Sequence, residues 1–540
     1  MITAVQSAAR ARVPGNAQAV DATGKFLIPG LWDMHVHWYD DRFVSLFIAN
    51  GVTGVRQMWG MPMHFDWRER TRSGALVAPR FAIASTIVDG PNPVWPGSIV
   101  VNDAVEARAT VRKIKDGGFD FVKVYSQLSR ESYLAIADEA KKLGIPFAGH
   151  VPSSMTVIEA SNAGQRSIEH LTGVLTATSA AEEEVTRQRA EIRKALGGKP
   201  LDTTARAALR QLDERVLATY DETKASALFA TFVRNGTWHS PTLVVLRSMA
   251  SLDDPAFTSD PRLKYMPPSI RNSWVPKNDF RLSTRTPEDY AAARRLFRKQ
   301  LEVVGAMHRA GVKLIAGTDV LNPFAFPGFS LHDELALLVE AGLTPVEALK
   351  AATLNAADYL GQRNVRGTIE SGKSADLVLL DANPLENVAN TKRIASVVFD
   401  GRLLDRRQLD TMLADAERIA NLKSIATTLL RTIETQGIDA ALAQYRDLKR
   451  REPETYDFSE GEFNGLGYRL LAQKKVDEAI AIFLLNVEAF SRSSNAFDSL
   501  AEAYMTKGNR DLAIQNYKRA LELDPKNTNA VAMLKKLGGF

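Results

Sequence analysis

The sequence predicts an α/β protein with three parts: a parallel (β/α)8 TIM barrel, a small β-sandwich domain formed by the segments that flank it, and an all-helical C-terminal domain. Eight short apolar runs alternate with helical stretches between residues 26 and 320, which predicts the barrel. After the barrel, apolar residues recur at every second position, as in β-strands. Roughly the last 120 residues are dense in Ala, Leu, Lys and Glu at helical spacing. The expected boundaries are 1–25 and 366–406 for the sandwich, 26–365 for the barrel and 407–540 for the helices.

Composition excludes several classes of protein. The chain has 540 residues, of which 45% are hydrophobic and 24% charged, so a large core is expected and global disorder is excluded. The 68 Lys and Arg exceed the 63 Asp and Glu by only five, too few to indicate a nucleic-acid partner. There is no cysteine, so disulfides, thiol nucleophiles and Cys-based zinc sites are excluded. Any metal must be held by histidine and carboxylate.

No apolar run reaches the roughly 18 to 20 residues that a membrane span needs, and we expect no span. The segment Met1–Pro14 lacks a cationic leader followed by an apolar core. From the chain as given the expected location is the cytoplasm; an export signal upstream would make it the periplasm or the exterior.

The eight expected barrel strands are short, and most are followed by a helical pattern such as Glu131–Leu143 or Pro287–Ala310. An open doubly wound sheet is the alternative, but no Gly-rich phosphate loop follows the first strand. The strands are expected within 26–37, 51–56, 80–85, 119–125, 145–150, 167–170, 238–245 and 312–319.

Helices and a second sheet are expected after the eighth strand. Ser330 with Asp333 reads as a capping box, and Thr344 to Glu347 opens another helix with an N-cap, a proline and an acid. Residues 376–380 and 395–400 then alternate as strands, and strand-like fragments in 1–23 complete the small sheet.

The C-terminal region contains a repeat of 34 residues. Ala479-Ile480 returns at Ala513-Ile514, Phe483 at Tyr517, and Asn495-Ala496 at Asn529-Ala530. The later copy resembles a tetratricopeptide helix pair; the copy in 461–493 is weaker, and a third unit is expected around 437–453. These helices serve either as a groove for a protein partner or as a cap for self-association and stability.

The distribution of histidines is the strongest functional signal. Three predicted strands end on His35 and His37, on His150 and on His170, and a fourth ends on Asp319. Active sites of barrels are assembled at the C-terminal ends of the strands, so we expect these five side chains to converge there. Imidazole and carboxylate ligands suit zinc or a similar divalent ion.

Lys123 lies inside an apolar strand between Val122 and Val124, where an unpaired ammonium would be costly to bury. Burial lowers the pKa of a lysine and makes its amine nucleophilic toward carbon dioxide. A carboxylated Lys123 would be an anionic ligand able to bridge two metals; an ordinary ion-paired lysine is the alternative.

These pieces together resemble the amidohydrolase superfamily. Residues 28–37 match its first motif, and 122–125, 149–152, 168–170 and 317–319 match its later motifs in order. The resemblance covers 1 to about 405 and is closest to imidazolonepropionase-like enzymes and metal-dependent prolidases (Xaa-Pro dipeptidases). Members of the family carry additional strands before the part that corresponds to Ile2–Val5, so the N-terminal half of the small sheet is expected to be short here.

The resemblance implies a site with two divalent metal ions, zinc by expectation. His35, His37 and Asp319 would hold the more buried ion, His150 and His170 the more exposed one, and carboxylated Lys123 and a hydroxide would bridge them. Asp319 would be the catalytic residue, accepting a proton from the attacking hydroxide and passing it to the leaving amine.

Two further residues are candidates for contact with the substrate. Tyr125 lies two residues after Lys123, and His239 lies on the seventh strand; core packing and a structural histidine are the respective alternatives. The long segments 176–230 and 251–283 follow barrel strands and are expected to form rims or lids.

The sequence therefore predicts a metal-dependent hydrolase of an amide bond in a small molecule, a dipeptide of Xaa-Pro type or an N-acyl amino acid. The alternatives are hydrolysis of a cyclic amide, a lactone or a carbamate-like compound, and a non-catalytic scaffold whose repeats bind a partner. The intact set of ligands argues against the scaffold.

Overall fold

The computed structural model describes residues 1–10, 13–197, 201–525 and 527–539. The chain divides into two compact units, Met1–Glu417 and Arg418–Phe540. The first unit holds the barrel and the small sheet, and the second holds the C-terminal helices.

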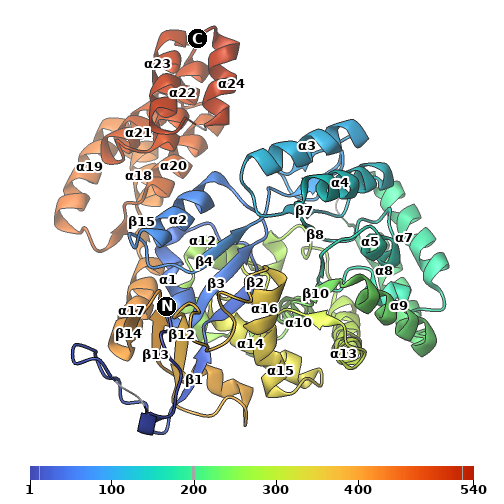
Figure 1. Ribbon diagram of the computed structural model, residues 1–540. Coiled ribbons are helices and arrows are strands. Elements are labelled where there is room, and N and C mark those ends of the chain that lie inside the picture. The colour runs from blue at the N-terminus through green and yellow to red at the C-terminus, as the bar shows by residue number, and fades with distance from the viewer. Residues whose placement is uncertain (11–12, 198–200, 526, 540) are drawn as a thin grey trace. The chain divides into compact units, whose positions relative to one another are not determined.

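The barrel of the first unit is closed by parallel strand pairing (Figure 1). β2, β3 and β4 form one parallel sheet, and β7 to β11 pair in sequence in another. Parallel bridges Ala84–Phe121 and Val36–Val320 join the two sheets at both edges, which confirms the predicted TIM barrel. Its strands are β2 (Leu31–Val36), β3 (Val52–Gln57), β4 (Arg80–Ile83), β7 (Val122–Val124), β8 (Phe147–Gly149), β9 (Ser167–Glu169), β10 (Trp238–Ser240) and β11 (Lys313–Leu314), with β5 (Val88–Asp89) and β6 (Ile99–Val100) beside β7.

The seventh strand is shorter than its apolar run predicts. β10 ends at Ser240, Thr242 has a φ of 50°, and Leu243–Ser251 forms helix α10 instead. The carboxylate of Glu334, 90 residues away, accepts a hydrogen bond from the backbone N–H of Val244 at 2.8 Å and so satisfies the start of this helix. A local apolar pattern cannot reveal such a distant partner.

Helices surround the barrel (Figure 1). Thr344 caps α15 in a capping box with Glu347, as predicted, but Ser330 lies inside α14 and its hydroxyl accepts from the N–H of Phe326. α14 instead begins after Gly328. The barrel helices are α1 (Ser45–Ala49), α2 (Pro62–Arg72), α3 (Ala104–Asp116), α4 (Arg130–Leu143), α5 (Val157–Asn162), α9 (Glu222–Asn235), α13 (Pro287–Arg309), α14 (Phe329–Glu340), α15 (Pro345–Ala351) and α16 (Leu354–Tyr359).

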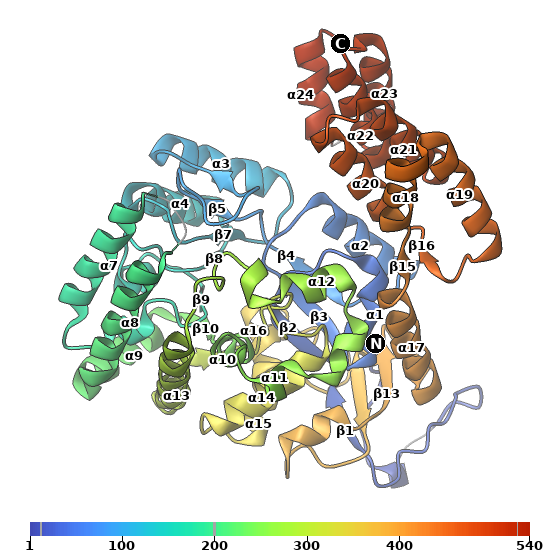
Figure 2. The ribbon, with the colours of Figure 1, turned by 180° about the vertical axis from the view of Figure 1, so that it is seen from behind.

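The two long segments that follow β9 and β10 are largely helical. α6 (Val174–Ala177), α7 (Glu182–Leu196) and α8 (Thr203–Ala218) precede α9, and Figure 2 shows α7, α8 and α9 side by side outside the strands. The second segment contains α10, α11 (Pro255–Thr258) and α12 (Pro268–Ser273).

The small domain is one antiparallel sheet, in the order β1 (Phe26–Pro29), β12 (Leu377–Leu380), β13 (Ile394–Phe399) and β14 (Arg402–Asp405). It differs from the expected sandwich, because no second sheet faces it within the described residues. The described part of 1–25 contains no strand. Ile2 forms backbone hydrogen bonds with Gly372 and Lys373, the carbonyl of Thr3 accepts from the hydroxyl of Ser371, and Lys25 pairs with Asp381. The N-terminal strand of the sheet is β1, directly ahead of the barrel.

α17 (Arg406–Ala420) crosses from the first unit into the second, so the second unit begins about ten residues later than predicted. Its helices pack as successive pairs; in one pair, Gly467 of α20 lies so close to the ring of Phe483 in α21 that a Cβ would come within 2.4 Å of it. The helices are α18 (Ile425–Gln436), α19 (Ile438–Arg451), α20 (Glu460–Ala472), α21 (Val476–Ala489), α22 (Ser494–Lys507), α23 (Arg510–Leu523) and α24 (Thr528–Leu537), with short strands β15 (Lys423–Ser424) and β16 (Tyr456–Asp457). In the described chain, no helix combines the length and apolarity of a membrane span.

Candidate metal centre

Three of the predicted ligands converge at the C-terminal end of the barrel. The Nε2 atoms of His35 and His37 lie 3.3 Å apart, and Asp319 Oδ1 lies 3.3 Å from the first and 3.1 Å from the second. Two atoms that are each about 2.0–2.1 Å from a tetrahedral ion lie about 3.3–3.4 Å apart, so this triangle has the dimensions of one face of a zinc site. The three side chains fit a divalent metal.

The backbone around β11 is shaped to make this approach. Gly317 lies three residues after β11, and a Cβ there would come within 2.9 Å of the His35 backbone nitrogen, so only glycine permits this segment to lie so close to β2. The hydroxyl and N–H of Thr318 donate to the buried carboxylate of Asp33 at 2.6 and 3.0 Å. Asp319 then adopts a φ of 56°, a costly conformation for a residue with a side chain, which is typical of functional sites.

His150 and His170 stand beside this triangle. The His170 ring centroid lies 4.6 Å from that of His35 and 4.9 Å from that of His150, and His170 Nδ1 lies 3.8 Å from Asp319 Oδ2. One ligand atom from each of His35, His170 and Asp319 falls within 4.8 Å of the others. The five residues predicted to converge therefore do so.

Hydrogen bonds select the nitrogen of His170 that is free for a ligand. The Thr242 hydroxyl donates its single hydrogen to the carbonyl of Pro241 at 2.7 Å, so it accepts from His170 Nδ1, also at 2.7 Å. His170 Nε2 then carries a lone pair. His150 Nδ1 lies 3.0 Å from the hydroxyl of Ser126, which orients that ring as well.

Lys123 is fully buried on β7, and its Nζ has no hydrogen-bond partner within the described chain. Burial lowers the pKa of Lys123 to about 8, although Glu169 and Asp319 oppose the shift. An orphaned buried amine is costly as an ammonium, and carboxylation would replace it with an anion that cations can satisfy. The environment of Lys123 fits the predicted bridging ligand.

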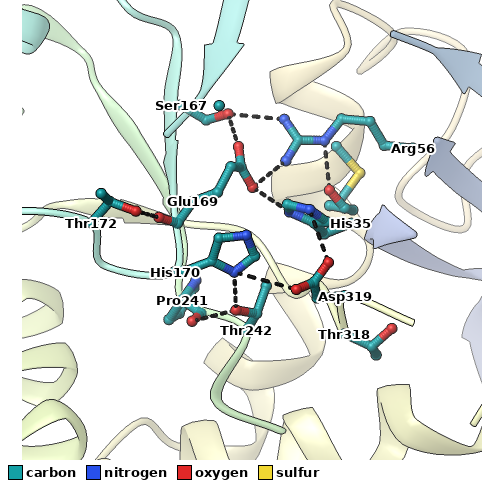
Figure 3. A network of polar contacts seen from close by, with 12 residues as sticks. His35, Arg56, Ser167, Glu169, His170, Thr172, Pro241, Thr242, Thr318 and Asp319 are labelled. Atoms are coloured by element: carbon teal, nitrogen blue, oxygen red, sulfur yellow. Dashed lines mark hydrogen bonds and ion pairs between the residues drawn. The ribbon is translucent and has the colours of Figure 1, made fainter. Parts of the chain in front are cut away.

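A buried network that sequence reasoning missed lies behind the ligands (Figure 3). The Glu169 carboxylate accepts from His35 Nδ1 and from the Arg56 guanidinium, both at 2.8 Å, and also from the Ser167 hydroxyl. Arg56 further donates to the carbonyl of Met34 and the hydroxyl of Tyr359. With His35 Nδ1 holding a proton toward Glu169, Nε2 keeps its lone pair for a metal.

The charge states suit metal binding. Burial lowers the pKa values of His35, His150 and His170, so these imidazoles are neutral and able to coordinate. Burial alone would raise the pKa of Asp319, but His170 and His37 lower it below its usual value. Asp319 is therefore a carboxylate.

A cavity of about 560 Å³ opens directly onto the centre; His37, His150, His170 and Asp319 are among its lining residues. Tyr125 lines it too, stacked on His150 at 4.0 Å between centroids and accepting a hydrogen bond from Trp95 Nε1. In this hydrogen bond the Tyr125 oxygen is the acceptor, so the hydroxyl hydrogen is not used by it and can be donated to a ligand.

His239, the other candidate for substrate contact, is not among the residues that line the cavity. It shares register with Ile168, which alternates with the inward Ser167 and Glu169. Its ring packs 4.4 Å from that of Phe232 in the helix layer. The structure thus places His239 on the outer face of β10, in the position of a structural histidine.

The chain belongs to the amidohydrolase family, whose model matches residues 26–404. A tetratricopeptide repeat model matches residues 494–527. Among curated relatives, the imidazolonepropionase of Deinococcus deserti is 46% identical over 83 residues, which are 15% of this chain and 20% of that protein. The ochratoxinase of Aspergillus niger is 37% identical over 103 residues, or 19% and 20% of the two chains. The chain thus spans about a fifth of the length of these relatives.

Solved structures share the fold more extensively. Bottromycin amidohydrolase superposes with a TM-score of 0.60 at 28% identity, covering 74% of this chain and 81% of its own. A prolidase complexed with N-methylphosphonate-L-proline gives a TM-score of 0.50 at 21% identity, with 74% and 91% covered. The fold and family predicted from the motifs are confirmed.

Proposed function

We propose that this protein is a metal-dependent amidohydrolase with two divalent ions, most simply zinc, that cleaves an amide bond in a dipeptide of Xaa-Pro type or an N-acyl amino acid. The observation that carries the proposal is the triangle of His35 Nε2, His37 Nε2 and Asp319 Oδ1, with edges of 3.1–3.3 Å. Six residues would hold the ions: His35, His37, Lys123, His150, His170 and Asp319.

When bound, such a pair of ions activates water as a nucleophile and polarises the scissile carbonyl. Asp319 is one corner of the ligand triangle and also lines the cavity, so its carboxylate is placed to accept the proton of the attacking water and deliver it to the leaving amine. Tyr125 presents its O–H to the cavity and would donate a hydrogen bond to the substrate.

The cavity supports a substrate with an apolar body and a carboxylate. Trp59, Trp95, Trp274 and Phe280 contribute aromatic surface to its wall. Arg281 is its one Arg or Lys among the described residues. Three of the five guanidinium N–H groups of Arg281 donate to Asp279 and Asn322, and the other two can donate to a substrate carboxylate. A free carboxylate is the feature that dipeptides and N-acyl amino acids share.

The family and the name of one similar structure support amide hydrolysis. Similar proteins are named as an amidohydrolase, an imidazolonepropionase and an ochratoxinase. Hydrolysis of a cyclic amide, lactone or carbamate-like compound on the same centre is the second candidate. The second unit, with its tetratricopeptide match, would contact a protein partner or a second copy of the chain.

The test is zinc reconstitution followed by assays on Xaa-Pro dipeptides and N-acyl amino acids. His150→Ala is expected to lose about one zinc ion per chain and more than about 100-fold in kcat/KM. The matched control is His308→Ala, because His308 lies on α13, pairs with Glu347 and is not among the residues that line the cavity. An active His150→Ala enzyme would refute the ligand role, and zinc-loaded protein without activity on any amide would favour the scaffold.

A further inference from the structure

A second cavity, of about 580 Å³, lies at the opposite end of the barrel. Arg80 is the first residue of β4, Arg166 directly precedes β9, and Phe121 directly precedes β7. These are N-terminal ends of strands, whereas the metal centre occupies the C-terminal ends. None of the lining residues of this basal cavity also lines the cavity at the metal centre.

Arginines make up most of the charged lining of the basal cavity. Five arginines line it, against a single acid, Asp120. Three of the five have carboxylate partners: Arg68 pairs with Asp120, Arg72 with Glu69, and Arg80 with Asp376 and Asp400.

Arg166 and Arg366 have no carboxylate partner within the described chain. Arg166 donates to the carbonyl of Tyr359 and stacks over its ring at 5.0 Å. Arg366 lies over the ring of Trp32 at 5.3 Å, and its Nε and Nη1 are buried without any hydrogen-bond partner in the described residues. Burial and the charge of Arg80 lower the pKa of Arg366. Buried donors left unsatisfied are costly, which is the expected state of a site that awaits a ligand.

A hydroxyl in the cavity suits the same ligand. The hydroxyl of Thr71 is also buried without a partner among the described residues and can donate a hydrogen bond to an anion. Each of these two guanidinium groups lies against an aromatic ring of the lining, Arg166 against Tyr359 and Arg366 against Trp32. Guanidinium forks bind planar or tetrahedral oxyanions through paired hydrogen bonds, and the volume suits a small molecule.

We propose that the basal cavity binds the phosphate or carboxylate group of a small anionic molecule, held by Arg166 and Arg366. This site is separate from the metal centre and does not depend on the proposed hydrolysis.

The test is calorimetric titration of the full-length protein with inorganic phosphate and, separately, citrate, in chloride buffer of matched ionic strength. Saturable binding of either probe is expected, and the tighter probe identifies phosphate or carboxylate as the preferred group. Arg366→Gln should weaken binding by at least about tenfold. Arg187→Gln, which removes an exposed arginine on α7, should leave it unchanged.

Two further variants separate the outcomes. Binding should persist in His150→Ala; its loss there together with retention in Arg366→Gln would place the anion at the metal centre and overturn the proposal. Arg366→Met should raise the Tm in anion-free buffer, because it removes unsatisfied buried donors, whereas a purely structural arginine would lower it. Absence of saturable binding of both probes to the wild type would also overturn the proposal.

Discussion

Glu169→Gln is the sharpest perturbation of the network behind the ligands. The substitution keeps the shape of the side chain but removes the negative charge between His35 and Arg56. Arg56 and Glu169 are both fully buried and 2.8 Å apart, so Arg56 would be left as an uncompensated buried cation. Removing one partner of such a pair costs about 3–5 kcal/mol in the free energy of unfolding.

The same substitution is expected to weaken metal binding. A glutamine can donate to His35 Nδ1 and favour the tautomer with a proton on Nε2, where the lone pair is needed. Loss of a carboxylate that orients a ligand typically weakens metal binding by about 10–100-fold. Zinc affinity would be measured by competition with a chromogenic chelator.

Unfolding by urea in the presence of a chelator isolates the structural cost. Glu191→Gln removes one member of an exposed pair with Arg187 and should change stability by less than about 1 kcal/mol. The double variant Arg56→Met/Glu169→Met should cost less than the sum of the single variants. If Glu169→Gln changed neither stability by more than 1 kcal/mol nor zinc affinity, the reasoning on orientation and pairing would be refuted.

Three other predictions follow from the same structure. Lys123→Ala should abolish activity, and bicarbonate should speed zinc reconstitution of the wild type; the absence of any bicarbonate effect would count against carboxylation. Burial raises the pKa of Glu334 to about 8 from an ordinary value of 4.5. The folded state therefore binds this proton more tightly than the unfolded state, so stability is lost as pH rises from about 4.5 toward 8, at up to about 1.4 kcal/mol per pH unit. Glu334→Gln should flatten that decline in urea unfolding at pH 5 and 7.5, and equal slopes for the two proteins would refute the assignment. Truncation after Ala420 should preserve kcat and zinc content, and a folded but inactive product would show that the second unit shapes the active centre.

The strands, the repeats and the convergence of the candidate ligands were predictable because each has a local signature. The alternation of apolar runs located all eight barrel strands, and His35, His150 and His170 stand where strand ends place them. The barrel rule that brings strand ends together then predicted their convergence.

What the sequence did not reveal depends on distant contacts. Glu169 follows Ile168 in a recognised motif, but its partner His35 is 134 residues away. Arg56 is a charged residue inside an apolar strand, which is the same signal that singled out Lys123. No neighbouring residue in the sequence indicates that its partner is Glu169. The sequence left open whether His239 contacts substrate or is structural, because the face on which it lies depends on register with β9, which only the structure provides.

Metal stoichiometry of the zinc-reconstituted protein, measured by inductively coupled plasma mass spectrometry alongside amide hydrolysis, tests the account most directly. Two ions per chain that rise and fall with activity are predicted, with a decrease in both when His35 is replaced by alanine. Protein that stays folded, takes up no zinc and still cleaves amides would contradict it.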